Sequence, residues 1–274
     1  MTAEHIIGID VVIDETMGAL GHESHPLSTV SDAEVLTVAV VGAAMFWNHH
    51  ARALTVLRAL GYLSHGLSAS RFSRRLHASA AWLTLLLDVR GDLFALGQAA
   101  ICDFVIDSMP VPVCKRVRAR RCRTVQGRAS CGSCAAKKDK VFGWRLHLVC
   151  TTDGLPVAFT LLPGGWHDLT PLHELTVELP EGAWVYGDKA YNSAPDEAVI
   201  RARGGGVLVP LHTDTMVPHT RAEQCGLRTV RLAIETVNSQ LTAMGLAHLH
   251  VRSVAGLEIN VHASLLALTC LNLD

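Results

Sequence analysis

The pattern of apolar residues changes near residue 100, and this change limits the chain to a two-part organisation. From Ser31 to about Ala100 the apolar residues recur at helical spacing without a proline, which predicts a helical region. Ser31 and Glu34 have the S-x-x-E form of a capping box, in which both side chains satisfy free backbone donors at a helix start. We therefore expect a helical N-terminal DNA-binding region at residues 1–100 and a second domain at residues 101–274.

After Asp103 the sequence changes to short runs of β-forming residues bounded by turn residues. Asp153 and Gly154 predict a tight turn between the second and the third of these runs. The resulting order β-β-β-α-β-α-β-α is typical of an α/β domain, with a mixed sheet flanked by helices. The strands are expected at 103–109, 145–151, 157–162, 184–186 and 207–210, and the helices at 168–179, 195–203 and 228–244.

The charge distribution is uneven although the formal net charge is only −1. Between Lys115 and Arg145 many basic residues are opposed only by Asp139, so this segment is a candidate contact for the phosphates of DNA. An earlier segment with Arg71, Arg74 and Arg75 predicts a helix with a basic face, which is either solvated or in contact with DNA. The candidate DNA contacts in the basic segment are Lys115, Arg116, Arg118, Arg120, Arg121, Arg123, Lys137 and Lys138.

Three carboxylates occur at positions where strands and a helix would bring them together. Asp107 lies inside the first strand, Asp188 directly follows the fourth, and Glu235 lies in the last long helix. Carboxylates that converge repel each other, so a stable cluster requires a cation, and hard oxygen ligands favour Mg²⁺ or Mn²⁺. Two such ions would suit the cleavage and rejoining of a phosphodiester. The alternative for each residue is a turn, a helix cap or an exposed helix position.

At these residues the chain closely resembles the transposases of the insertion-sequence-982 family, within the DDE group of RNase H-like enzymes. The resemblance covers most of the chain. The matching motifs are Ile106-Asp107-Ser108, Arg121-Cys122-Arg123, Phe142-Gly143, His147-Leu148, Asp153-Gly154, His167-Asp168, Tyr186-Gly187-Asp188-Lys189-Ala190-Tyr191 and Ile234-Glu235-Thr236-Val237.

The resemblance implies an RNase H-like core, with Asp107, Asp188 and Glu235 as the catalytic metal ligands. It implies DNA cleavage and strand transfer at the terminal inverted repeats of a mobile element, with double-stranded DNA, including target DNA, as the partner and a homodimer on that DNA. Two alternatives remain: a nuclease of the same fold, and a catalytically silent relic that binds the same element ends. Lys189 and Arg231 are further candidate DNA contacts.

Two other groups of residues are candidates for supporting roles. His167 and Asp168 follow the third strand and would lie in the catalytic neighbourhood, unless Asp168 only caps the next helix. A basic loop at 114–140 contains cysteines that would bind structural Zn²⁺ as thiolates, with reduced free thiols as the alternative. These cysteines are Cys114, Cys122, Cys131 and Cys134.

The sequence predicts no contact with a membrane. Apolar stretches such as 35–47 and 80–87 fall short of the roughly 18 residues that a membrane span needs. The N-terminus also lacks the pattern of a signal peptide. We expect a cytoplasmic protein of a bacterium or archaeon, associated with the nucleoid.

Overall fold

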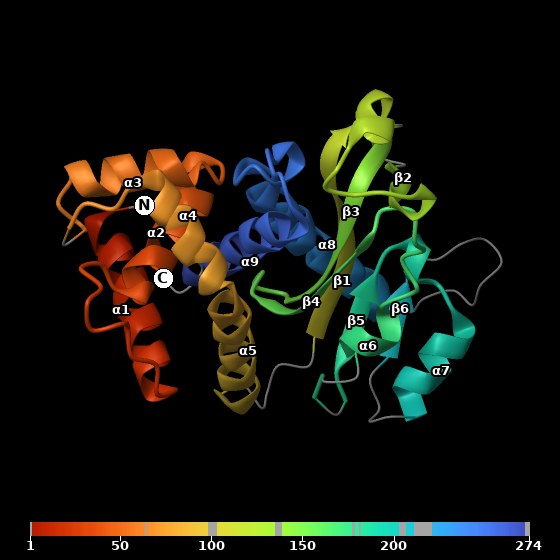
Figure 1. The fold of residues 1–274 in the computed structure, drawn as a ribbon. Coiled ribbons are helices and arrows are strands. Elements are labelled where there is room, and N and C mark those ends of the chain that lie inside the picture. Colours follow the sequence, from red (N-terminus) through yellow and green to blue (C-terminus); the bar gives the residue numbers. More distant parts are fainter. Residues whose placement is uncertain are drawn as a thin grey trace. The chain divides into compact units, whose positions relative to one another are not determined.

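A computed structural model gives the fold of the chain (Figure 1). It describes residues 2–63, 65–97, 103–134, 139–176, 179–180, 182–202, 207–210 and 221–271. Within these ranges only the backbone is described for residues 90–97, 128, 133–134, 139, 194, 207–210, 222–224, 228–229 and 231. The chain divides into two compact units, the first formed by Met1–Arg90 with Leu241–Asp274 and the second by Gly91–Gln240.

The first unit is helical, as the apolar periodicity predicts. The capping box is present at the start of α2: the Glu34 backbone N–H donates to Ser31 Oγ at 2.9 Å, and the Ser31 N–H donates to Glu34 Oε2 at 2.6 Å. The first helix of the unit, α1, was not predicted. The elements up to residue 97 are α1 (Ala3–Ala19), α2 (Asp32–Phe46), α3 (His50–Ala59), α4 (Ala69–Ala78) and α5 (Ala80–Gly97).

The C-terminal helix α9 (Val254–Leu271) is part of the core of this first unit, and not of the second domain that was expected to run to residue 274. It packs against α2, and Leu257, Val261 and Leu265 are fully buried. In Figure 1 its blue ribbon ends among the red and orange helices. The Asn48 side chain reinforces this end of the unit, since its Nδ2 donates to the Met244 carbonyl at 2.9 Å.

Among the described helices, α9 alone is long and apolar enough to cross a membrane, a stretch that the sequence analysis overlooked. However, 61% of it is buried inside the structure, and its packing against α2 is that of a core helix. Length and composition alone are therefore weak evidence for a membrane span here.

Two buried histidines of the first unit should make its stability fall at acidic pH. Burial lowers the pKa of His50 to about 4, and the neighbouring His77 and His49 lower it in the same direction; burial alone lowers the pKa of His262 to about 4. Below the ordinary pKa of 6.5 the unfolded chain binds protons that the folded one does not, so stability is lost progressively between pH 6.5 and pH 4. A pKa shift from 6.5 to about 4 corresponds to about 3 kcal/mol in the free energy of unfolding for each histidine, once the pH is below both values.

Urea unfolding at pH 7, 5.5 and 4.5 would measure this loss. His262→Gln should flatten the pH dependence, because glutamine can still contact Thr84 Oγ1 but does not titrate. An unchanged pH dependence in this variant would show that His262 is not a source of the acid sensitivity.

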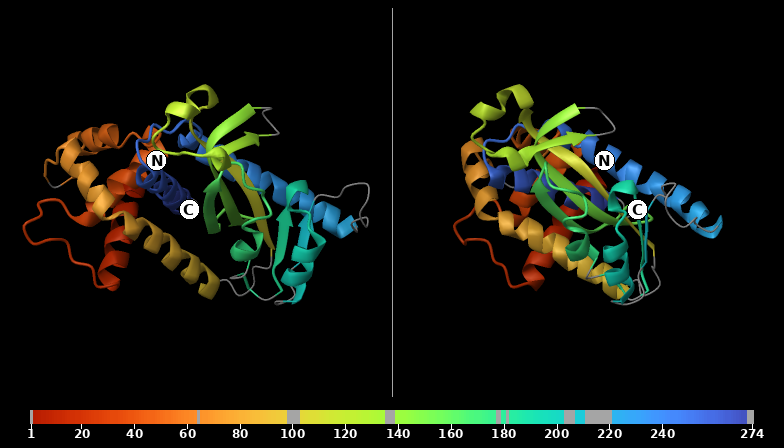
Figure 2. Two further views of the ribbon diagram at one scale, coloured as in Figure 1. Left: turned by 45° about the vertical axis from the view of Figure 1, so that its right-hand side comes forward. Right: turned by 90° about the vertical axis from the view of Figure 1, so that its right-hand side faces the viewer.

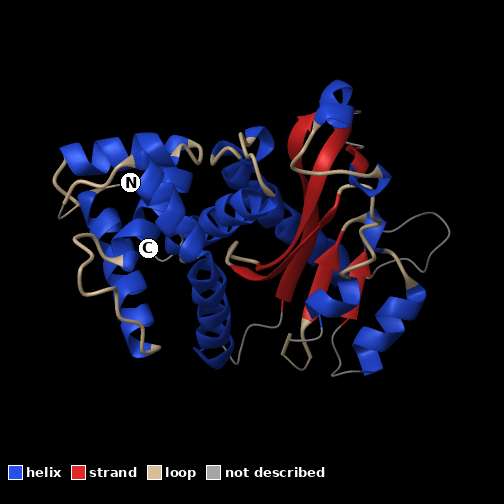
Figure 3. Cartoon of the chain, viewed as in Figure 1, coloured by secondary structure: helices blue, strands red, loops and turns tan. Residues whose placement is uncertain are grey.

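The second unit contains a six-stranded mixed sheet (Figures 2 and 3). The strand order is β2-β3-β1-β5-β6, with β4 also paired to β3; β1 runs antiparallel to β3 and parallel to β5. All the predicted strands are confirmed, and only β2 was not anticipated. The strands are β1 (Asp103–Lys115), β2 (Cys131–Cys134), β3 (Asp139–Thr151), β4 (Pro156–Pro163), β5 (Trp184–Gly187) and β6 (Val207–Pro210).

The predicted helices of this unit are also present, and the predicted hairpin turn is confirmed because Gly154 has a φ of 84°. One face of β1 and β5 packs into an apolar cluster that includes Phe104, Ile106, Val185 and Tyr191. The fold therefore agrees with an RNase H-like mixed sheet and flanking helices. The helices are α6 (Leu172–Thr176), α7 (Ala194–Ala202) and α8 (Arg221–Ala243), with short 3₁₀ turns at Arg116–Arg121, Arg128–Ser130, Lys189–Tyr191 and Leu246–His248.

Candidate active site

Asp107 lies in the central strand β1, where it is paired with Leu148 of β3 and stands two residues beyond the last residue of β1 that pairs with β5. Its two neighbours in the strand sequence, Ile106 and Ser108, point to the opposite face, because side chains alternate along a strand. Both carboxylate oxygens of Asp107 accept a hydrogen bond. Oδ1 accepts the Ser108 backbone N–H at 2.7 Å, and Oδ2 accepts Nδ2–H of Asn238 at 2.7 Å. This carboxylate is therefore held in one orientation.

Asp188 is brought to Asp107 by the parallel pairing of β1 and β5. In this register Val105 lies opposite Tyr186. The same register, continued by two residues, places Asp188 opposite Asp107. Asp188 is exposed, and its Oδ1 accepts the backbone N–H of Ala190 at 2.8 Å at the start of a 3₁₀ turn. It thus caps that turn, which was the alternative reading from the sequence, and it also lies within electrostatic range of Asp107.

Glu235 lies on α8, and the nearby Asn238 links this helix to Asp107. Residues three apart on a helix share a face, and the rise of the helix separates them by only about 4.5 Å along its axis. The bond from Asn238 to Asp107 therefore places the face that carries Glu235 beside β1. The Glu235 side chain itself is exposed.

The electrostatics of the site show that negative charge gathers around Asp107. Burial raises the pKa of the Asp107 carboxyl to about 6, and the Asp188 and Asp168 carboxylates raise it in the same direction. The hydrogen bonds from Ser108 and Asn238 act in the opposite direction. Carboxylates arranged in this way favour either a bound proton or a bound cation.

Asp168 belongs to a polar network on the other face of β1. Ser108 Oγ donates to Asp168 Oδ1 at 2.6 Å, and Arg145 Nη1 donates to the same oxygen at 2.7 Å and to Ser108 Oγ at 3.2 Å. Arg145 and Asp168 are 16% and 17% exposed, so this ion pair is largely shielded from water. The network fixes the residue that directly follows Asp107 in the strand.

His147 lies beneath this network and is fully buried, with its Nδ1 3.9 Å from Asp168 Oδ1. Burial lowers its pKa to about 4, with Asp168 opposing that shift and Arg145 adding to it. His147 is therefore a neutral core residue near pH 7. His167, which was paired with Asp168 in the sequence analysis, is instead exposed, and its Nδ1 accepts the backbone N–H of Leu169 at 3.3 Å.

A divalent cation fits the donors that are present, on the evidence of their chemistry. Asp107 and Asp188 supply hard oxygen ligands, and the charge of Asp188 is among the causes that raise the pKa of Asp107. Over the part of the chain that is described, no three His, Cys, Asp or Glu side chains form a group that could hold a metal ion. Among the described residues, Glu235 therefore does not complete such a group with the two aspartates.

The cysteines of the basic loop do not form a zinc site among the residues described. Cys131 begins the strand β2, and its side chain is exposed. Cys114 and Cys122 do interact with each other; burial raises the pKa of Cys114, and so does the contact with Cys122. The side chain of Cys134 is outside the described part of the structure.

The predicted DNA contacts are at the surface wherever their side chains are described. Six of them lie at the end of β1, in the adjoining 3₁₀ turn and just after it, and Lys189 is exposed next to Asp188. Lys137 and Lys138, and the side chain of Arg231, lie outside the described part of the chain. The six exposed residues are Lys115, Arg116, Arg118, Arg120, Arg121 and Arg123.

Sequence reasoning did not identify Ser108, Arg145 or Asn238 as part of the site. A weak signal existed for two of them. Arg145 is a charged residue at the start of an apolar strand, and Asn238 follows Glu235 at the spacing that shares a helix face. For Ser108 the signal was its place in the matching motif Ile106-Asp107-Ser108, which gave it no role beside Asp107.

A known protein family matches most of this chain. A family model described as "Transposase DDE domain" matches residues 98–270, which include Asp107, Asp188, Glu235 and the whole polar network. No curated protein and no solved structure matches the chain.

Proposed function

Because the chain belongs to the transposase DDE domain family, we propose that it cleaves the ends of an insertion sequence and joins them to target DNA. The family implies transposition and DNA binding. The observation that carries the specific proposal is the arrangement around Asp107: Asp188 lies beside it, and Asn238 attaches the helix of Glu235 to it. The family membership favours this enzyme over a silent DNA-binding relic.

We propose Asp107, Asp188 and Glu235 as the metal ligands. Two Mg²⁺ or Mn²⁺ ions held there would activate the attacking oxygen and stabilise the leaving oxygen of a phosphodiester. Within the chain itself, the bonds from Ser108 and Asn238 orient the Asp107 carboxylate before substrate arrives. Preorganisation of this kind means that little reorientation is needed during the reaction.

The exposed basic residues from Lys115 to Arg123 suit contact with the DNA backbone at a distance from the cleaved bond. The part of β1 from Asp107 to Lys115 is about 26 Å of extended chain. A duplex that reached both would therefore extend over several base pairs. These contacts would supply affinity that depends strongly on salt and little on sequence. Lys189, beside Asp188, is placed to meet a phosphate nearer to the carboxylates.

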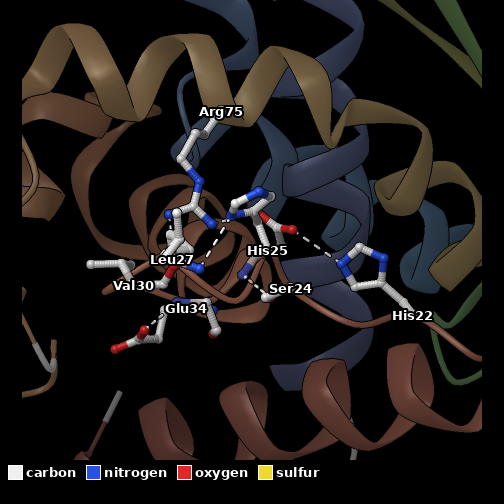
Figure 4. A network of polar contacts seen from close by, with 10 residues as sticks. His22, Ser24, His25, Leu27, Val30, Glu34 and Arg75 are labelled. Carbon is white, nitrogen blue, oxygen red and sulfur yellow. Dashed lines mark hydrogen bonds and ion pairs between the residues drawn. The ribbon is translucent and has the colours of Figure 1, made fainter.

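The helical unit offers a second basic surface on α4. Between Glu34 and Asp88 the sequence contains arginines and histidines but no acidic residue. Arg75 is engaged within the unit: its Nη1 donates to the Val30 carbonyl at 2.6 Å, and its Nη2 pairs with Asp32 (Figure 4). Arg71 and Arg74 are exposed on the same helix, so they remain available for DNA.

Replacing Arg71 and Arg74 together by alanine should weaken binding of element-end DNA by about 10- to 100-fold. The slope of log affinity against log salt should decrease by about one for each phosphate contact that is lost. Filter binding at several salt concentrations measures both quantities. Arg201→Ala is the matched control, because Arg201 is exposed on α7 and paired with Glu197. Equal effects of the control and of the α4 change would contradict a specific contact at α4.

We further propose that the protein belongs to the insertion-sequence-982 group, acts as a homodimer on the paired inverted repeats, and works in the cytoplasm at the nucleoid. The decisive experiment is incubation of the full chain with DNA that carries the parent element's ends, in Mg²⁺. Nicked and joined products support a transposase. Nicked products without joining identify a nuclease of the same fold, and binding without any cleavage identifies the relic.

A further inference from the structure

Asn238 is the side chain through which α8 contacts Asp107. It is half-buried, and its Nδ2–H donates to Asp107 Oδ2 at 2.7 Å across 131 residues of sequence. The other oxygen of Asp107 is already held by the next residue in the strand. Loss of the asparagine would therefore release one of the two oxygens and leave the carboxylate free to rotate about its side-chain bond.

We propose that Asn238 is a positioning residue that holds the Asp107 carboxylate and the Glu235 turn of α8 in one arrangement for binding a divalent cation. This inference rests on the proposed function and deepens it. Glu235 and Asn238 share a face of the helix. The hydrogen bond that orients Asp107 therefore also fixes the position of Glu235 along the direction of β1.

The chemistry of an amide suits this task better than that of a charged side chain. A lysine or arginine would neutralise Asp107 and compete with the cation, whereas a carboxylate would repel Asp107 until a cation was bound. A neutral N–H donor orients the carboxylate and leaves its charge available. In metal sites, donors that orient the ligands in this way commonly change metal affinity or activity by 10- to 100-fold when they are lost.

Apolar side chains on either side of Asn238 anchor α8. Ile234, Val237 and Leu241 lie on the helix around it and are 5%, 1% and 0% exposed, so apolar packing holds the helix in place. A substitution at Asn238 should accordingly change the site more than the stability. This separation makes a positioning role distinguishable from a purely structural one.

The test measures binding of Mn²⁺ alone to the full chain without DNA, by the loss of the free-ion signal in electron paramagnetic resonance. Asn238→Ala should weaken Mn²⁺ binding by about 10-fold or more, with a thermal unfolding midpoint close to that of the wild type. Asn238→Gln keeps the amide on a longer arm and should recover part of the affinity. Ser239→Ala, exposed on the same turn, is the matched control and should bind Mn²⁺ like the wild type.

The inference is overturned if Asn238→Ala binds Mn²⁺ as the wild type does, or if Ser239→Ala weakens binding equally. It is also overturned if the alanine variant loses stability in proportion to its loss of affinity, since the role would then be structural. Because this readout needs no DNA, it is separate from the proposed function. Suppose that the wild type binds Mn²⁺ but does not cleave DNA, and that Asn238→Ala and Asp107→Asn both weaken Mn²⁺ binding. The transposase proposal would then be wrong, and the positioning role of Asn238 would be supported.

Discussion

Asp107→Asn is expected to reduce cleavage of element-end DNA by about 10³-fold or more, which is equivalent to at least about 4 kcal/mol of transition-state stabilisation. Asparagine has the shape of aspartate, and its carbonyl oxygen can still accept a hydrogen bond from Ser108 or Asn238. What is removed is the negative charge that a divalent cation requires. DNA binding should persist, because the change removes a charge that repels phosphates.

The measurement is a single-turnover cleavage assay in Mg²⁺, together with DNA binding of the same preparations. Asp153→Asn is a matched control, since Asp153 is exposed in the β3–β4 turn and asparagine before glycine is equally compatible with that turn. Its activity should equal that of the wild type. Asp188→Asn and Glu235→Gln should resemble Asp107→Asn. An active Glu235→Gln would remove Glu235 from the ligand set without affecting the assignment of the two aspartates.

Asp168→Ala is expected to lower the free energy of unfolding by about 3 kcal/mol. The change leaves the shielded Arg145 guanidinium without its ion-pair partner and Ser108 Oγ without its acceptor. Breaking a largely buried pair from one side costs more than the pair itself contributes, because an uncompensated charge remains. Urea unfolding at pH 7 measures the loss.

A double-mutant cycle separates the ion pair from the loss of packing. Arg145→Met combined with Asp168→Ala should be more stable than the sum of the two single changes predicts, because no unpaired charge is left. Strict additivity would show that the two side chains do not act as a pair. A single Asp168→Ala variant within 0.5 kcal/mol of the wild type would show that Arg145 finds adequate solvation without Asp168.

Local patterns in the sequence predicted the sheet and its helices well. Strands such as 184–186 and 207–210 are short apolar runs between turn residues, and the capping box at Ser31 is formed by residues three apart. Such signals depend only on near neighbours. The same patterns predicted that Asp107 and Asp188 lie near each other, whereas their role as metal ligands remains a prediction.

The features that were missed depend on contacts between distant parts of the sequence. The contact of Asn238 with Asp107 depends on the packing of α8 against β1, and that of Arg145 with Asp168 on the pairing of β3 with β1. The placement of α9 with the N-terminal helices has the same origin. The helical spacing of the apolar residues of α9 predicts a buried helix, but it does not show in which of the two units the helix is buried. The narrower assignment to the insertion-sequence-982 group remains a prediction.

The return of α9 to the first unit affects the order in which the molecule can form during synthesis. Residues 254–271 leave the ribosome after the whole sheet has been made, yet Leu257, Val261 and Leu265 fill the interior around α2. Until then the early helices lack part of their apolar core and expose it to water. The sheet can therefore fold while the helical unit is still incomplete. A premature stop codon before Val254 would therefore destabilise the N-terminal helices, which are translated first.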